Sequence, residues 1–417
     1  MNAFVGPLTP RIERVLPALE QLYKDLHSHP ELAHQESRTA ALLATRLSEA
    51  GYQVTEKVGG TGVVGLLANG PGPTLMLRAD MDALPILERT GVPYASTCEA
   101  RDAKGENVPV SHACGHDMHM TWALGAALVL AEAKEAWRGT VMVVFQPAEE
   151  TGTGSQAMLD DGMVARFPRP DVILGQHLLQ YRAGTVATKA GQMLTAGDSF
   201  RVRFFGAGGH GGMPQNAIDP VVMASAAVLR LQTVVAREVP PQTQAVVTVG
   251  EFHAGHAENI IPAEAVLKLN IRTTDPAVRE HLLAAVRRVC EAEARASNAP
   301  REPEFEPINN FPLTVNDAEA TRRVTEAFRA QFGERLTEAI PVGASEDFGR
   351  FGQAWGAPYC YWFVGGTAPA AWDEARDRGT LATLPGPHSP YWAPALDPTL
   401  RTGIETLLAA AGSWLAA

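Results

Sequence analysis

Thr74-Leu-Met-Leu-Arg-Ala-Asp-Met81 is a short apolar run with one carboxylate, Asp80, at its end and another, Asp82, directly after it, and this pattern decides the fold. Similar runs, bounded by Gly and Pro, occupy residues 63–68, 140–145 and 171–175. Runs of this length predict strands, and the helical spacing of residues 121–136 predicts a helix between two of them. Strands that alternate with helices are typical of an α/β sheet.

Residues able to carry out chemistry follow these runs directly. Asp80 and Asp82 end one run, Glu149 and Glu150 follow another, and His177 follows a third. Because ligand sites in open α/β sheets lie at the carboxyl ends of the strands, these side chains are expected to meet at one edge of the sheet.

A second kind of pattern begins near residue 192. Phe200, Val202 and Phe204 alternate with Arg201 and Arg203, which predicts a half-buried strand. The expected elements after it are a helix at 220–237, strands at 245–251 and 265–272, a helix at 276–296 and a last strand at 304–307. This βαββαβ order is typical of a ferredoxin-like domain.

The sequence therefore predicts two domains. A catalytic α/β domain of residues 1–191 and 309–417 is expected to have a mixed sheet flanked by helices. Residues 192–308 are expected to form an inserted ferredoxin-like domain. The other elements expected in the catalytic domain are helices at 11–49, 317–332 and 398–415 and a strand at 359–364.

Composition excludes several classes of partner. The chain has 417 residues, with 35 basic and 46 acidic side chains, so the net charge of −11 argues against nucleic-acid binding. No Lys/Arg block, no apolar run of about 18 residues and no charged leader is present, so no membrane partner is expected. The four cysteines are sparse and unpatterned, which favours reduced thiols and a cytoplasmic protein.

The run His112-Ala-Cys-Gly-His-Asp-Met-His119 places three imidazoles, a thiol and a carboxylate in eight positions of a chain with only 12 His and 4 Cys. If the run is extended or looped, Cys114 and His116 fall on the same side and can bind one ion or two neighbouring ions. The density of ligand-type residues predicts a metal site.

Other candidate residues are less specific. The adjacent carboxylates Glu149 and Glu150 point in different directions, so one can bind a metal while the other transfers a proton. His177 and His388 are solitary, and each is as compatible with a structural role as with the site. Arg272 ends a predicted strand and has a planar fork that suits a carboxylate, although a surface role fits it equally.

Seven motifs in order resemble the M20 metallopeptidase family, and more narrowly its branch of amidohydrolases and aminoacylases that includes hippurate hydrolases and IAA-amino acid hydrolases. The motifs span nearly the whole chain, and any one of them alone would be weak evidence for the family. The motifs are Leu77-Arg-Ala-Asp-Met-Asp-Ala-Leu-Pro85, His112–His119, Gln146-Pro-Ala-Glu-Glu150, Gly208-Gly-His-Gly-Gly212, Glu258-Asn-Ile-Ile-Pro262, Ser345-Glu-Asp-Phe348 and His388-Ser-Pro390.

The resemblance implies a centre of two divalent metal ions per chain. Cys114 would bridge the ions, His116 and His177 would complete one site, and Glu150 and His388 would complete the other. Thiolate, imidazole and carboxylate together suit Zn, Mn, Co or Ni.

It also implies the remaining roles. Glu149 would be the general base for a metal-activated water. Asp82 would be a second catalytic carboxylate, and together with Asp80 it would orient the imidazoles of the ligands. The inserted domain of residues 192–308 would be a lid and dimerisation domain. From this lid, His210 would reach the reacting carbonyl, often across a dimer interface. Asn259 and Arg272 would fix the carboxylate of the substrate, in a homodimer or homotetramer formed through the lid domain.

The expected reaction is hydrolysis of the amide bond of an N-acyl amino acid or a related amide. One alternative is hydrolytic deamination of an aromatic amine on the same centre, and another is a catalytically silent, metal-dependent binding module. The chain departs from the family pattern at Gln215, where many relatives have His, and after His177, where Leu178-Leu-Gln replaces a Pro-containing turn. Substrate preference is therefore open.

Overall fold

The computed structural model describes residues 2–416 and divides them into two compact units. The larger unit contains residues up to 193, 315–341 and from 347 onward, and the smaller unit contains residues 194–314 and 342–346. The smaller unit thus begins two residues after the predicted boundary at 192 and extends beyond 308. It gains residues 342–346 because backbone and side-chain hydrogen bonds join Ala344 and Gly343 to Thr195 and Arg272.

The larger unit is built on the predicted mixed sheet. Its strand order is β1-β2-β6-β3-β7-β18-β8-β17, in which β6, β3, β7 and β18 run parallel and the β1–β2, β2–β6 and β18–β8 pairs are antiparallel. The bounds are β1 Gln53–Val58, β2 Gly62–Asn69, β3 Thr74–Asp80, β6 Gly139–Gln146, β7 Val172–Arg182, β8 Val186–Thr188, β17 Leu336–Glu338 and β18 Tyr359–Thr367.

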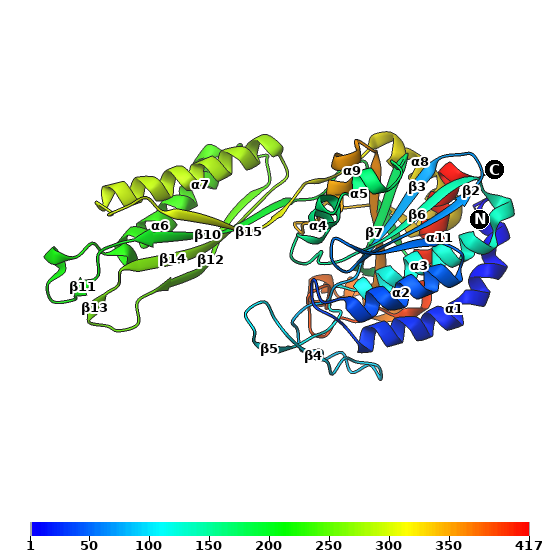
Figure 1. Cartoon of the computed structure of the whole chain (residues 1–417), viewed down its shortest axis with the longest axis horizontal. Coiled ribbons are helices and arrows are strands. Elements are labelled where there is room, and N and C mark those ends of the chain that lie inside the picture. Colours follow the sequence, from blue (N-terminus) through cyan, green and yellow to red (C-terminus); the bar gives the residue numbers. More distant parts are fainter. Residues whose placement is uncertain (1, 417) are drawn as a thin grey trace. The chain divides into compact units, whose positions relative to one another are not determined.

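Five helices share one hydrophobic core with this sheet (Figure 1). Trp122, Trp137, Trp362 and Phe328 are among its largest fully buried side chains. Helix α3 has buried apolar residues on all of its sides, as expected for a helix that packs between other helices and the sheet. The helices are α1 Val5–Ser28, α2 Ser37–Glu49, α3 His116–Glu132, α8 Ala318–Phe332 and α11 Leu396–Leu415.

The single opening helix expected over residues 11–49 is wrong. The chain forms α1 and α2, with a break that contains Pro30. Proline lacks a backbone N–H and disfavours helical geometry in the residue before it, so the helix ends ahead of it.

Smaller elements complete the larger unit, and the sequence did not predict them. They are the helices α4 Gly154–Asp160, α5 Met163–Arg166, α9 Gly349–Trp355 and α10 Pro369–Asp377 and the short strands β4 Glu99–Arg101 and β5 Asn107–Pro109. The strands β9 Gly191–Leu194 and β16 Thr314–Asn316 lie where the chain passes between the units.

The end of α1 is joined to α3 by a buried charge cluster. His27 Nδ1 lies 2.6 Å from Asp117 Oδ2, and His27 Nε2 lies 2.9 Å from Glu88 Oε1. Burial alone would lower the pKa of His27, but hydrogen bonds to the two carboxylates outweigh it and raise that pKa to about 10. His27 is therefore charged at neutral pH.

Replacing His27 by Leu is expected to destabilise the protein by about 3–5 kcal/mol, because two buried carboxylates lose their partner. The pKa of His27 is about 6.5 in the unfolded chain and about 10 in the folded protein. Protonated His27 therefore stabilises the folded state fully below pH 6.5, and this stabilisation is lost as the pH rises through about 10. Urea unfolding at pH 6, 8 and 10 should show the difference between variant and wild type shrinking toward pH 10. His29→Leu, at an exposed neighbour, is the control. A difference that does not change with pH would contradict the charged state of His27.

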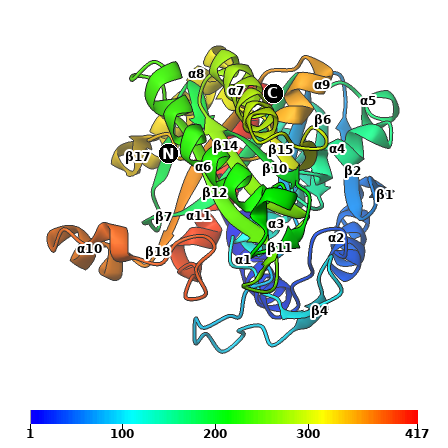
Figure 2. The same cartoon turned by 90° about the vertical axis from the view of Figure 1, so that its left-hand side faces the viewer.

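The smaller unit is the expected ferredoxin-like domain. Its antiparallel sheet has the order β12-β14-β10-β15, and α6 and α7 lie side by side along one face of it (Figures 1 and 2). Leu231, Val286, Leu267 and Phe204 form part of the core between helices and sheet. The bounds are β10 Ala196–Phe205, α6 Pro220–Glu238, β12 Ala245–Ala254, β14 Glu264–Thr273, α7 Pro276–Ala296 and β15 Glu304–Phe311.

Helix α6 is the one described helix whose length and apolar composition would allow it to cross a membrane. Met223, Ala227 and Leu231 on one side of it are buried in the core of the smaller unit. Val222 and Leu229 are exposed.

Candidate metal centre

The run at residues 112–119 is a tight turn followed by a helix, so of the two expected forms, extended or looped, the structure has the looped one. Gly115 has φ +86°, and α3 begins at His116. A Cβ atom on Gly115 would lie 2.7 Å from Leu178 Cδ2, so a larger residue would clash as well as strain the backbone. This glycine turn, and not strand alternation, brings Cys114 and His116 to the same site.

The structure brings all five predicted ligands together. Cys114, His116 and His177 form one group and Cys114, Glu150 and His388 form another, and within each group the ligand-type atoms lie within 4.8 Å of one another. Cys114 is common to both groups, as a bridging residue would be. Their role as metal ligands stays a prediction that this geometry allows.

The imidazoles are oriented for binding through Nε2. His116 Nδ1 lies 2.9 Å from the backbone oxygen of Asp82, and His177 Nδ1 lies 2.7 Å from that of Leu178. Backbone acceptors at Nδ1 favour the tautomer with its lone pair on Nε2.

Two polar atoms at the centre suit a cation. Within residues 2–416, His116 Nε2 and Glu150 Oε1 are buried and have no hydrogen-bond partner. Leaving buried polar atoms unpaired is costly, and two bound divalent ions, one in each group, would satisfy these atoms. The thiolate, imidazole and carboxylate donors around them therefore fit a metal centre by their chemistry.

Electrostatics at the centre favour protonated ligands when metal is absent. Burial, with Glu150 and Glu149 nearby, raises the pKa of Cys114 well above its ordinary value. Burial lowers the pKa of His116, but Asp80 and Asp82 outweigh it and raise that pKa to about 10. Both groups must lose a proton before they can bind a metal.

Metal binding should therefore release protons. We expect one proton from Cys114 and one from His116, so that affinity falls about tenfold per pH unit for each proton as pH is lowered. Calorimetric titration of metal-free protein with Zn²⁺, in buffers of different ionisation enthalpy, measures the number released. Equal heats in all buffers would contradict this electrostatic description.

The loop after β6 positions the two adjacent glutamates. The backbone N–H groups of Glu149 and Glu150 donate to Asp82 Oδ1 and Oδ2 at 3.1 and 3.0 Å. Glu149 Oε2 lies 4.0 Å and Glu150 Oε1 3.8 Å from His116 Nε2. The structure thus places Asp82 under this loop, with its carboxylate also 3.3 Å from His116 Nδ1.

Asp80 belongs to a second layer of contacts. Its carboxylate lies 2.6 Å from His119 Nδ1 and accepts from Arg78 Nη1 at 2.7 Å. Burial would raise the pKa of Asp80, but His116, His119 and Arg78 hold it well below its ordinary value. Since the Leu178 amide donates to His119 Nε2 at 2.8 Å, both ring nitrogens of His119 are engaged within the protein.

Sequence reasoning missed a buried network behind the centre. Arg78 Nη2 lies 3.2 Å from Asp347 Oδ1, and Gln146 Nε2 donates to the same oxygen at 2.7 Å. The Ser155 hydroxyl donates to Asp347 Oδ2 at 2.7 Å. Arg78, Gln146 and Asp347 each lie in one of the quoted motifs, but nothing in the sequence joins them, since the contacts link residues up to 269 positions apart.

His177 and His388 reach the centre in different ways. His177 was expected after the end of a strand, but β7 continues to Arg182 because its pairing with β18 continues past His177. His388 lies in a loop with φ +69°, and its backbone N–H donates to Ala113 O at 2.8 Å, which anchors this loop beside Cys114.

The predicted lid residues do not form one site within a single chain. His210 and Asn259 lie together in a hairpin of β11 (Gly209–His210) and β13 (Ile260–Ile261), where the Gly211 N–H donates to Asn259 O at 2.8 Å. Strand β14 begins at Glu264, next to this hairpin, and Arg272 lies near its other end. Eight residues at about 3.3 Å each place Arg272 roughly 26 Å from Glu264 along the strand.

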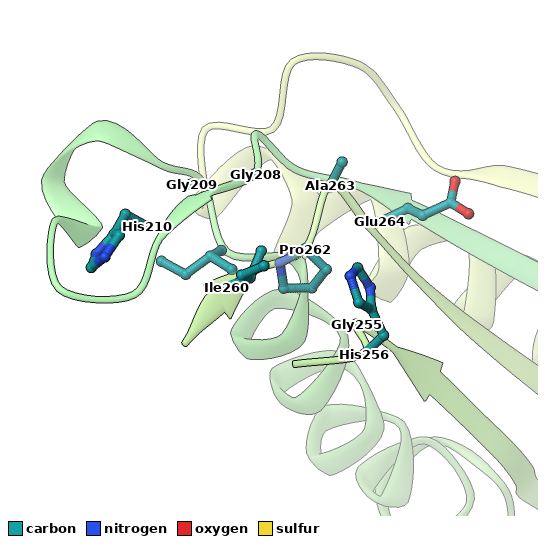
Figure 3. A pocket seen from close by; sticks show the side chains of 10 residues that line it. Gly208, Gly209, His210, Gly255, His256, Ile260, Pro262, Ala263 and Glu264 are labelled. Atoms are coloured by element: carbon teal, nitrogen blue, oxygen red, sulfur yellow. The ribbon is translucent and has the colours of Figure 1, made fainter. Parts of the chain in front are cut away.

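The hairpin end contains a pocket of about 630 Å³ (Figure 3). Figure 3 shows His210 at one side of it and His256 at the other, with the side chain of Ile260 and the ring of Pro262 between them. Ile260 is 47% exposed, so this end presents apolar surface beside the His210 imidazole.

Arg272 is held by neutral groups. Its Nε donates to Asn270 Oδ1 at 3.0 Å, and its Nη1 donates to Gly343 O at 2.7 Å and to Ser345 Oγ at 3.2 Å. Partial burial lowers the pKa of Arg272. On the same sheet face, Lys268 and Arg201 form ion pairs with glutamates. The hydrogen-bond partners of Arg272 are neutral, so its positive charge can bind an anion.

Known proteins resemble this chain over most of its length. The model of peptidase family M20/M25/M40 matches residues 76–383. Hippurate hydrolase of Campylobacter jejuni is 39% identical over 82% of this chain and 87% of its own, and N-acetyl-L-cysteine deacetylase of Bacillus subtilis is 35% identical over 78% and 75%. The crystal structure of Bacillus subtilis YXEP, a dinuclear metal binding peptidase from the M20 family, matches with a TM-score of 0.75 and 26% identity, covering 96% of this chain and 98% of its own.

Proposed function

Because the chain belongs to peptidase family M20/M25/M40 and is a metal-dependent amidohydrolase, we propose that it cleaves the amide bond of N-acyl amino acids. The observation that carries this proposal is the pair of ligand groups that share Cys114, with Glu149 beside them. The donor set suits Zn, Mn, Co or Ni.

Glu149 is the proposed general base. Two divalent ions held by the ligand groups would polarise the amide carbonyl and make water a better nucleophile. The carboxylate of Glu149 takes the proton from the attacking water and passes it to the leaving nitrogen. Its fixed backbone, held by Asp82, supports this role because proton transfer requires a defined position.

Arg272 is the proposed binding group for the carboxylate of the substrate. A guanidinium held only by neutral acceptors and a hydroxyl retains its full charge for an anionic ligand. The names of the relatives support an amino acid product, since hippurate and N-acetyl-L-cysteine each carry a free carboxylate beside the amide.

His210 and Asn259 are proposed to act on a substrate bound by another copy of the chain, in a homodimer. The separation of roughly 26 Å along β14 supports this, because one small substrate cannot contact Arg272 and His210 of the same lid. Equilibrium sedimentation, together with activity regained on mixing His210→Ala and Glu149→Gln proteins, tests the shared site. Absence of recovery from subunits shown to exchange would exclude it.

The competing function is hydrolytic deamination of an aromatic amine, which would use the same ligands and base. Product analysis separates the two: we expect a carboxylate and an amino acid in equal amounts from N-acyl amino acids, with no ammonia. A screen of N-acyl amino acids and aryl amines with protein reconstituted with Zn²⁺, Mn²⁺, Co²⁺ or Ni²⁺ provides this test. Ammonia release without amide cleavage would favour the deaminase.

A further inference from the structure

Glu36 is a buried carboxylate that none of the proposed steps uses. It lies in the link between α1 and α2, and its side chain is fully enclosed. Its Oε1 accepts hydrogen bonds from the backbone N–H of Ala148 at 2.8 Å and of His34 at 3.0 Å, and its Oε2 accepts from the Thr61 hydroxyl at 2.6 Å.

The hydrogen bond from the Ala148 N–H to Glu36 adds to the two that Asp82 accepts from the same loop. Three successive backbone N–H groups, those of Ala148, Glu149 and Glu150, each donate to a buried carboxylate oxygen. Pro147 has no N–H to contribute. Two acidic side chains thus hold the backbone of the whole segment that carries the proposed base and one proposed ligand.

Enclosing two carboxylates side by side works against stability. Burial and the nearby charge of Asp82 raise the pKa of Glu36 to about 7. A pair of apolar residues would avoid this cost. The arrangement is therefore better explained by what it does to the loop than by its contribution to stability.

Ala148 shows what the loop requires. Its φ is +49°, in the left-handed region that residues with a Cβ rarely adopt. Its oxygen also accepts from the N–H groups of Thr153 and Gly154, which closes the turn. If Ala148 returned to negative φ, the directions of Glu149 and Glu150 relative to Cys114 and His116 would change.

We propose that Glu36 is a positioning residue of the metal centre: its carboxylate holds Ala148 in the left-handed conformation and thereby orients Glu149 and Glu150. This inference rests on the proposed function only for its kinetic consequence. Its structural consequence, a preformed ligand at Glu150, can be measured without any substrate.

Two substitutions separate length from charge at Glu36. Glu36→Asp keeps the charge but shortens the side chain by about 1.5 Å, so that its oxygen no longer reaches the Ala148 N–H. Glu36→Gln keeps the length and an acceptor oxygen, and its amide can donate to the Thr61 hydroxyl. We expect Glu36→Asp to lower kcat and the affinity for Co²⁺ by about 10- to 100-fold, and Glu36→Gln to remain close to wild type in both.

Ala148→Gly supplies the rescue. Glycine adopts positive φ without steric cost, so the Glu36→Asp/Ala148→Gly double variant should regain most of the lost kcat and Co²⁺ affinity, with KM little changed throughout. Thr61→Val is the matched control, because it removes a partner of Glu36 but leaves the bond to Ala148; it should alter stability and not kcat.

Co²⁺ titration of metal-free protein, followed by thiolate-to-cobalt absorption, provides a readout independent of catalysis. The proposal is overturned if Glu36→Asp binds Co²⁺ like wild type, if the double variant is no better than Glu36→Asp, or if Glu36→Gln is as impaired as Glu36→Asp. Absence of amide hydrolysis in wild type would instead refute the proposed function and leave the Co²⁺ result standing.

Discussion

Glu149→Gln is expected to lower kcat by about 10²- to 10⁴-fold while two metal ions per chain remain bound. Glutamine has the same shape but cannot accept the proton of the attacking water. The proposed ligands do not include Glu149, and its backbone is held through its N–H by Asp82, so the substitution leaves the centre in place. Steady-state kinetics with metal analysis of the same sample provides the measurement.

The adjacent Glu150 provides the control. Glu150→Gln removes a charged ligand from the Cys114, Glu150 and His388 group, so we expect it to lose bound metal as well as activity. Full activity in Glu149→Gln would refute the role of the base, and metal loss as large as in Glu150→Gln would make Glu149 a ligand.

Cys114→Ala is expected to abolish both metal binding and activity. Cys114 is the one residue common to the two ligand groups, so its removal takes a donor from each ion, whereas His388→Ala takes a donor from one. Metal analysis after dialysis should find close to no bound ion in Cys114→Ala and about one per chain in His388→Ala.

The partly buried Cys98 serves as the control for loss of a thiol. Its Sγ contacts Ser28 O at 3.4 Å, and it belongs to neither ligand group. Cys98→Ala should keep both ions and full activity. Retention of two ions by Cys114→Ala would exclude a bridging thiolate.

The core of the fold could be predicted because its signals are local. The apolar runs that became β2, β3 and β6 lie within one or two residues of their predicted bounds, and α7 begins and ends where its pattern does. The shortest elements were missed, even where they are buried. Strand β8 pairs antiparallel with β18 and parallel with β17, yet it has only three residues and therefore no recognisable periodicity.

The sequence predicted which residues lie in the candidate site, but not how they are arranged. Resemblance implied five ligands, and the structure brings these residues together. The position of His177 inside β7 and the support of Ala148 by Glu36 depend instead on contacts between distant segments. The separation of His210 from Arg272 likewise follows from the length of β14 within the sheet. Motif order alone carries none of this information.

Titration of metal-free protein with Mn²⁺ or Zn²⁺, with hydrolysis of an N-acyl amino acid followed at each addition, tests the central claim most directly. The two ligand groups predict that activity reaches its maximum when two ions are bound per chain. Maximal activity with one ion per chain, or no amide cleavage with two ions bound, would contradict a two-metal amidohydrolase built around Cys114.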